Sequence, residues 1–114
     1  MVLMAGAACA GGLVISGTYG NAAGCKYAAS HELDGDDLLV LTSQGISSYA
    51  SHCAFVQVLL HGDKSIVATV LCDNEGEEIR TVGLMRLEKG TDDVDTYDIY
   101  DADGSNWGKV GKCL

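Results

Sequence analysis

The chain of 114 residues contains no proline, one phenylalanine and one tryptophan, and it has no charged side chain before Lys26. The absence of proline is compatible with a β-ladder that uses every backbone N–H group. No cofactor motif is present, the histidines lack zinc-ligand spacing, and nothing near them resembles a G-x-S-x-G nucleophile turn. The sequence therefore predicts a protein that is not an enzyme, with no catalytic residue, no metal site and no cofactor.

Positive charge is also scarce. The chain has 16 acidic residues against 7 basic ones, a net charge of −9, and all of this charge lies at or beyond Lys26. Such a surface repels nucleic acid and anionic lipid headgroups and attracts cations or basic proteins. We therefore expect a basic protein as partner and no nucleic acid.

The charge-free run over residues 1–24 predicts a signal peptide, followed by one exported domain over residues 25–114. Glycines interrupt the run, and because glycine destabilises helices the run is unlike a membrane-spanning helix of about 20 apolar residues. As a signal it is unusual, because no Lys or Arg follows Met1. The sequence before Cys25 (AAG) fits a signal peptidase site and also a lipobox with Ala in place of Leu. Lipidation of Cys25 would tie the protein to a membrane; without it we expect no membrane association.

Four cysteines lie in the charged part of the chain, and an even number in a short exported domain is typical of a disulfide framework. A domain of this size buries only about 60–70% of its unfolded surface, so two bridges would add stability that its core lacks. Plain secretion keeps all four cysteines available for pairing: Cys25, Cys53, Cys72 and Cys113. We expect a periplasmic or secreted protein.

From Asp37 onward, short apolar and β-branched runs alternate with turn residues, and no segment shows a helical period. This pattern predicts an all-β antiparallel meander of about six strands, a small disulfide-stapled barrel or half-barrel. The expected strands are 38–42, 53–61, 64–72, 78–87, 94–100 and 106–113.

A two-residue turn at Gly62-Asp63 would place His61 opposite Lys64. Farther along the same hairpin, Cys53 then stands opposite Cys72, at a separation that a disulfide tolerates. The register predicts the bridge Cys53–Cys72, which leaves Cys25 to pair with Cys113. A bulge or a slip of one residue in this hairpin remains an alternative.

The best candidate binding surface lies near the C-terminus, where aspartates without a neighbouring cation accompany aromatic residues. A turn at Asp103-Gly104 would set Tyr100 opposite Trp107 and Tyr97 opposite Val110, and such cross-strand pairs are most often structural. If exposed, this hairpin would bind protein through its aromatic rings. Its predicted binding residues are Asp92, Asp93, Asp95, Tyr97, Tyr100 and Trp107.

Two further patterns have ordinary explanations. The sequence Asp101-Ala102-Asp103-Gly104 matches half of a calcium loop, but the rest of that loop is missing, so we interpret it as a hairpin turn. His31, His52 or His61 would serve as a metal ligand, or as a base for Ser51 or Ser48, only if the fold brought the partners together. We expect these histidines at the surface or at strand ends.

Three segments carry a family resemblance. The sequence GISSY over residues 45–49, the sequence CDNEGE over residues 72–77 and the final pair Lys112-Cys113 resemble small exported four-cysteine bacterial domains of unknown function, which share a C-x-x-E-G-E motif and a terminal basic-Cys pair. The resemblance covers residues 25–113 and implies an exported, disulfide-bonded domain. It implies no activity. In size and bridges the chain is also similar to small lipocalin-like barrels that inhibit hydrolases.

The sequence thus predicts a non-enzymatic, acidic β domain that acts as a protein-binding module. The alternative is an inhibitor of an extracytoplasmic or host hydrolase, which needs a protruding segment such as residues 26–37. An enzyme would instead need a concave pocket that joins a histidine to a carboxylate or serine.

Overall fold

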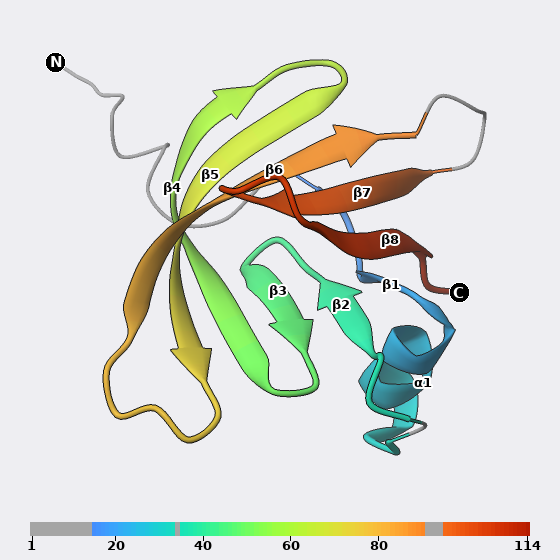
Figure 1. Cartoon of the computed structure of the whole chain (residues 1–114). Helices are drawn as coiled ribbons and strands as arrows, with labels where there is room; N and C mark the ends of the chain where they lie inside the picture. The colour runs from blue at the N-terminus through green and yellow to red at the C-terminus, as the bar shows by residue number, and fades with distance from the viewer. Residues whose placement is uncertain (1–14, 34, 91–94) are drawn as a thin grey trace, which may run out of the picture.

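Eight antiparallel strands form a closed barrel in the computed structural model, which describes residues 15–33, 35–90 and 95–114 (Figure 1). Each strand pairs with its neighbours in the chain, and β1 pairs with β8 to close the barrel. The all-β prediction is confirmed, with eight strands in the described ranges instead of about six. The elements are β1 (Tyr19–Gly20), α1 (Ala22–Ser30), β2 (Leu39–Leu41), β3 (Gly45–Ser48), β4 (Ser51–His61), β5 (Ser65–Asn74), β6 (Thr81–Lys89), β7 (Thr96–Asp101) and β8 (Asn106–Lys112).

The barrel interior is filled by apolar side chains. Along β5 the residues alternate between the two faces, so that Ile66, Ala68 and Val70 are buried while Val67 and Thr69 face outward. The largest fully buried side chains come from seven different strands, β2 to β8: Leu41, Ile46, Cys53, Val70, Leu87, Ile99 and Val110. A small barrel packed in this way has its binding surfaces on the outside.

The barrel begins at Tyr19, before the expected domain boundary. Tyr19 lies opposite Leu41 of β2 and Lys112 of β8, and with 4% exposure it belongs to the core. Residues 19–24 thus belong to the barrel and its helix in this structure, although they were predicted to lie in a signal peptide. The small, uncharged residues of this stretch suit a two-residue strand and a tightly packed helix as well as they suit an export signal.

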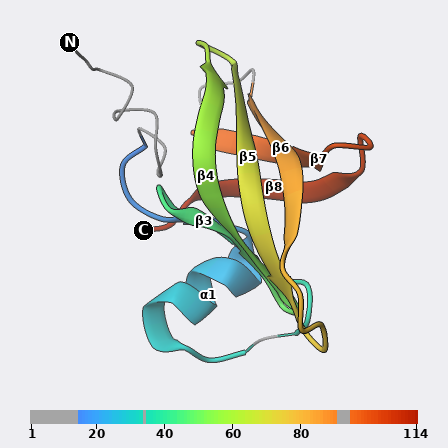
Figure 2. The same ribbon diagram turned by 90° about the vertical axis from the view of Figure 1, so that its left-hand side faces the viewer.

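Helix α1 covers one end of the barrel, next to β1 and β2 (Figure 2). Its N-cap Asn21 accepts a hydrogen bond from the Gly24 N–H at 2.7 Å and another from the Leu39 N–H at 3.1 Å. A Cβ at Gly24 would collide with the Leu39 carbonyl, so glycine permits this close approach. In the described part of the chain, no helix is long and apolar enough to cross a membrane.

Both predicted disulfides are present. Cys25 of α1 is bonded to Cys113 just after β8, with Cα atoms 5.5 Å apart, and this bridge fixes the helix to the end of the barrel. Cys53 is bonded to Cys72 directly across the β4–β5 hairpin.

The hairpin reaches that register by a different route from the expected one. His61 lies opposite Ile66, not Lys64, because the turn has four residues, closed by a hydrogen bond from the Gly62 N–H to the Ser65 carbonyl. The predicted two-residue turn is wrong. Two β-bulges, at Val56 and Leu59, add two residues to β4 and offset the longer turn before the strand reaches Cys53.

Candidate functional site

The structure describes four of the six residues of the predicted acidic and aromatic surface: Asp95, Tyr97, Tyr100 and Trp107. Asp92 and Asp93 lie outside the described residues. Tyr97 is 8% exposed and packs edge-on against Tyr19 inside the barrel, with ring centroids 5.4 Å apart. Asp95 accepts a hydrogen bond from the Tyr19 hydroxyl at 2.7 Å, so it supports the barrel seam. Tyr97 is therefore part of the barrel interior, whereas the Asp95 side chain is 43% exposed.

Tyr100 and Trp107 do not face each other. The β7–β8 hairpin has a bulge, so Tyr100 lies opposite Asn106, while Tyr97 lies opposite Val110 as predicted. The bulge falls at Trp107, next to Gly108, whose φ of +135° suits glycine alone. The predicted Tyr100–Trp107 pair is therefore wrong.

Each of these two aromatic rings has another contact. The Arg86 guanidinium lies 4.3 Å from the centre of the Tyr100 ring. The Trp107 indole N–H donates to the Asp101 carboxylate at 3.2 Å. Each ring thus contacts a charged side chain of this protein: Arg86 for Tyr100 and Asp101 for Trp107.

The Asp101–Ser105 segment is a hairpin turn, as interpreted from the sequence. The Asp101 carboxylate accepts backbone hydrogen bonds from Asp103 at 3.2 Å and from Ser105 at 3.1 Å. Hydrogen bonding to Asp101 and to Ser105 lowers the pKa of the Asp103 carboxyl to about 2. The turn uses these oxygens itself, and no group of three or more His, Cys, Asp or Glu residues in the described ranges is arranged to hold a metal ion.

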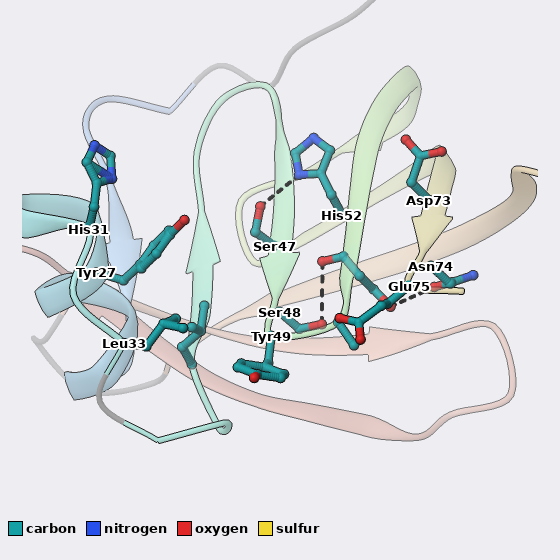
Figure 3. A pocket seen from close by; sticks show the side chains of 13 residues that line it. Tyr27, His31, Leu33, Ser47, Ser48, Tyr49, His52, Asp73, Asn74 and Glu75 are labelled. Atoms are coloured by element: carbon teal, nitrogen blue, oxygen red, sulfur yellow. Dashed lines mark hydrogen bonds between the residues drawn. The ribbon is translucent and has the colours of Figure 1, made fainter. Parts of the chain in front are cut away.

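A groove of about 710 Å³ lies on another part of the surface, between α1 and the β3–β4 hairpin (Figure 3). One wall comes from the helix and the segment after it, and the other from β3, β4 and the end of β5. The lining residues are Tyr27, His31, Leu33, Leu38, Ser47, Ser48, Tyr49, Ala50, Ser51, His52, Asp73, Asn74 and Glu75. This groove is the candidate site, and we call it the helix–hairpin groove.

The helix wall presents an aromatic pair. The rings of Tyr27 and His31 meet edge to face, with centroids 5.6 Å apart. His31 ends the helix in the left-handed conformation, at φ 61°, and its N–H donates to the Tyr27 carbonyl at 2.7 Å. Leu33 follows them, and its side chain is 58% exposed. This wall therefore offers apolar and aromatic surface to an occupant.

The hairpin wall carries a hydrogen-bonded serine and histidine. The Ser47 hydroxyl and the His52 Nδ1 are 2.7 Å apart, and the two residues are partners across β3 and β4 (Figure 3). Asp73 is the partner of His52 on β5, so Ser47, His52 and Asp73 lie in one row across three strands. The pocket that an enzyme would need thus exists, with Ser47 in place of Ser48 or Ser51.

The row lacks the contacts of a catalytic triad. In a triad the histidine uses one ring nitrogen for the serine and the other for an aspartate that orients it. Here the Asp73 carboxylate accepts from the Arg80 guanidinium at 2.9 Å, and within the described residues it makes no hydrogen bond to His52. The arrangement can offer hydrogen bonds to a bound group, but it has no oriented base.

Carboxylates give the groove its charge. Asp73 and Glu75 line it, and no Lys or Arg does. The Glu75 N–H donates to the Ala50 carbonyl at 2.7 Å, which fixes the end of β5 against the β3–β4 turn. Among the described residues the Glu75 carboxylate has no ion-pair partner, so it remains available to a cation.

Two segments that were singled out in the sequence meet at this groove. Residues 45–49 supply Ser47, Ser48 and Tyr49, and residues 72–77 supply Asp73, Asn74 and Glu75. The Ser51 hydroxyl donates to the Asn74 side chain at 2.6 Å, and that side chain donates to Glu77 at 2.9 Å. The two sequence segments, residues 45–49 and 72–77, were the signal from which the groove could have been found. The contribution of Tyr27 was missed because no helix was expected there.

No protein-family model, no curated protein and no solved structure matches this chain.

Proposed function

We propose that this protein is an exported, non-enzymatic interaction module that binds a basic segment of a partner protein in the helix–hairpin groove. The observation that carries the proposal is the lining of the groove, which combines two exposed tyrosine rings with the Glu75 carboxylate, unpaired among the described residues, and with Asp73, which is paired with Arg80. A partner lysine or arginine would find both a counter-charge and an aromatic surface there.

The energetics favour such an occupant over an anionic one. A cation over an aromatic ring gains about 0.5–1 kcal/mol at an exposed site, and more where water is excluded. Tyr27 is 37% exposed and Tyr49 is 51% exposed, so both rings retain surface to cover. Large, rigid aromatic side chains of this kind dominate binding energy at protein interfaces.

The charge of the whole chain supports the same partner. At a net charge of −9, its long-range field attracts basic proteins and raises their association rate at low ionic strength. The field shortens with the Debye length, which falls to about 3 Å at 1 M salt. Binding in the groove should therefore weaken as salt increases.

The cysteines support a location outside the cytoplasm. Two disulfides are consistent with an oxidising compartment, and we propose the periplasm or the extracellular medium. The Cys25 sulfur is bonded to Cys113, so in this structure it is not free to carry a lipid. This arrangement favours a secreted protein over a lipoprotein.

A displayed library of random heptapeptides, selected on the protein at low salt, tests the proposal. We expect the enriched peptides to contain Lys or Arg beside an apolar residue. The best peptide should bind about tenfold more weakly to Glu75→Gln and to Tyr49→Ala. Asp63→Asn, which removes the same charge at the exposed β4–β5 turn, is the matched control and should bind as the wild type does. Peptides without cations, or equal loss in Asp63→Asn and Glu75→Gln, would overturn the groove as the binding site.

Inhibition of a hydrolase is a second candidate, favoured by one exposed loop. Of residues 26–37, those up to Ser30 belong to helix α1, and the described residues after it belong to the connection to β2. The β5–β6 loop does present an apolar tip, since Ile79 is 79% exposed. Assays against a lysozyme and a secreted zinc protease test this function: inhibition abolished by Ile79→Asp would support it, and no inhibition would remove it.

A further inference from the structure

The barrel is closed, but the second half of strand β4 has one free edge. Strand β4 pairs with β5 along its length, but it pairs with β3 only from His52 to Ala54. The last contact on that side is a hydrogen bond from the Phe55 N–H to the Gln44 carbonyl at 3.0 Å. Figure 1 shows the β4–β5 hairpin projecting beyond the end of β3. Within the described ranges, residues 56–61 therefore have no strand beside them on this edge.

The free edge is apolar. Val56 is 50% exposed, and Leu59 and Leu60 are each 53% exposed. The bulges at Val56 and Leu59 bend the strand and place extra side chains along it. Natural edge strands are usually protected by lysine, proline or an inward charge, and along residues 56–61 the described part of the chain shows bulges as the only such protection. The segment thus keeps apolar surface that another chain can cover.

The edge is also uncharged in a strongly charged protein. No Asp, Glu, Lys or Arg occurs over residues 38–62, although the chain carries 23 such residues in all. A second copy that approached by the acidic parts of the surface would meet charge of its own sign. Approach through β4 brings neutral, apolar surface against itself.

We propose that two copies of this protein associate through β4, with residues 56–61 of one copy antiparallel to the same residues of the other. Such a contact is isologous, because each copy contributes the same patch and a two-fold axis relates them. Antiparallel pairing joins the two sheets by backbone hydrogen bonds, as in the addition of a strand to a free edge. The bulges keep the ladder short, so the packing of Leu59 and Leu60 supplies most of the affinity.

This interface is separate from the helix–hairpin groove, and the two respond to salt in opposite ways. Binding of a basic segment weakens with salt. Pairing of two copies at a net charge of −9 each strengthens with salt, because screening reduces the repulsion between them. The direction of the salt effect therefore distinguishes the failure of one proposal from the failure of the other.

Sedimentation equilibrium of the full protein, from micromolar concentrations to about 0.5 mM and at low and high salt, measures the association. We expect a monomer–dimer equilibrium that shifts toward dimer at high salt. Amide exchange at residues 56–61 should slow as the protein concentration rises, while exchange in β7 should not change.

Leu60→Glu should raise the dimer dissociation constant about 10- to 100-fold. The substitution places a charge in an apolar contact, and because the dimer is two-fold symmetric it does so twice. Leu59→Ser is a second variant that adds no charge. Val82→Glu is the matched control, since Val82 is 77% exposed on β6, away from the free edge. Far-UV circular dichroism and non-reducing mass analysis check that each variant is folded and bridged.

Three results would overturn the proposal. The first is a monomer at all concentrations and salts. The second is a dimer that Leu60→Glu and Leu59→Ser leave as tight as Val82→Glu does. The third is a monomer that binds phosphatidylcholine vesicles, with loss in Leu60→Glu, which would assign the edge to a lipid surface instead of to a second copy.

Discussion

The Tyr19 hydroxyl donates a hydrogen bond to the Asp95 carboxylate at 2.7 Å and so joins two segments that are 76 residues apart in the sequence. Tyr19 belongs to β1, and Asp95 immediately precedes β7. The other Asp95 oxygen is buried, and its near partner is the Lys89 ammonium at 3.8 Å, an ion pair too long for a hydrogen bond. The hydrogen bond therefore links β1, the strand that closes the barrel, to the segment that leads into β7.

Because of this contact, we expect the free energy of unfolding to depend on pH in the alkaline range. Burial, and then the hydrogen bond to Asp95, raise the pKa of Tyr19 well above its usual value of about 10. A raised pKa means that the stabilising contribution of Tyr19 is complete below about pH 10 and is lost as the pH rises further. Tyr19→Phe should be about 1–3 kcal/mol less stable at neutral pH and should lose less stability between about pH 9 and pH 11. Urea unfolding at these pH values measures both effects.

Tyr49→Phe is the control for this prediction, because the exposed Tyr49 lies on the β3–β4 turn. It should keep the alkaline slope of the wild-type protein. If Tyr19→Phe loses stability with pH as steeply as the wild type does, the Tyr19–Asp95 contact does not couple folding to pH.

The strands that sequence analysis located best are those with a clear alternation of side chains. β5 is one example, since Ile66, Ala68 and Val70 alternate with outward-facing residues. Strand β3 was not expected, because residues 45–48 are few and mostly small, with a single β-branched residue, Ile46, and so carry a weak strand signal. Without β3, the contact of Ser47 with His52 was out of reach.

Bulges explain the remaining differences, because they change a register without changing the composition of a strand. In β4 two bulges offset a longer turn, so the Cys53–Cys72 pairing was right although the turn was wrong. In β8 a bulge at Trp107 places Asn106 opposite Tyr100, so the predicted pairing of Tyr100 with Trp107 does not occur. The helix–hairpin groove was not predicted, because its lining residues come from α1, β3, β4 and β5, and their proximity depends on how these elements pack.

The start of the folded domain gives a second prediction. Cleavage between Gly24 and Cys25 would remove β1 and the helix N-cap Asn21, which bonds to Gly24 and Leu39. We expect the folded, exported protein to retain Tyr19, so any cleavage of a signal lies upstream of Tyr19. Intact mass of the protein recovered from the medium or periplasm measures this directly, and a stable species that begins at Cys25 would contradict it.

Gly24 provides a third test of the same helix. In a free helix, Gly24→Ala would stabilise by about 1 kcal/mol, because alanine is the better helix former. Here the new Cβ would collide with the Leu39 carbonyl oxygen, and overpacking against a fixed neighbour costs about 1–3 kcal/mol. We therefore expect a net destabilisation of up to about 2 kcal/mol, measured by urea unfolding.

Gly83→Ala is the matched control, since its Cβ would lie 3.5 Å from Val70, an ordinary contact. It should change stability much less than Gly24→Ala does. A Gly24→Ala variant that is as stable as the wild type would place helix α1 outside the folded unit.

The two disulfides should differ in what they contribute. Cys25 and Cys113 are 88 residues apart in the sequence, whereas Cys53 and Cys72 are 19 apart. The chain-entropy model gives about 4–5 kcal/mol for the long loop and about 3 kcal/mol for the short one. Cys25→Ala with Cys113→Ala should therefore lower the free energy of unfolding more than Cys53→Ala with Cys72→Ala. Cys53 is 1% exposed, so its replacement also leaves a small cavity that narrows the difference. Denaturant unfolding of both double variants under non-reducing conditions shows which one loses more free energy of unfolding. A larger loss of this free energy in the Cys53–Cys72 variant would mean that core packing around Cys53 outweighs closure of the long loop.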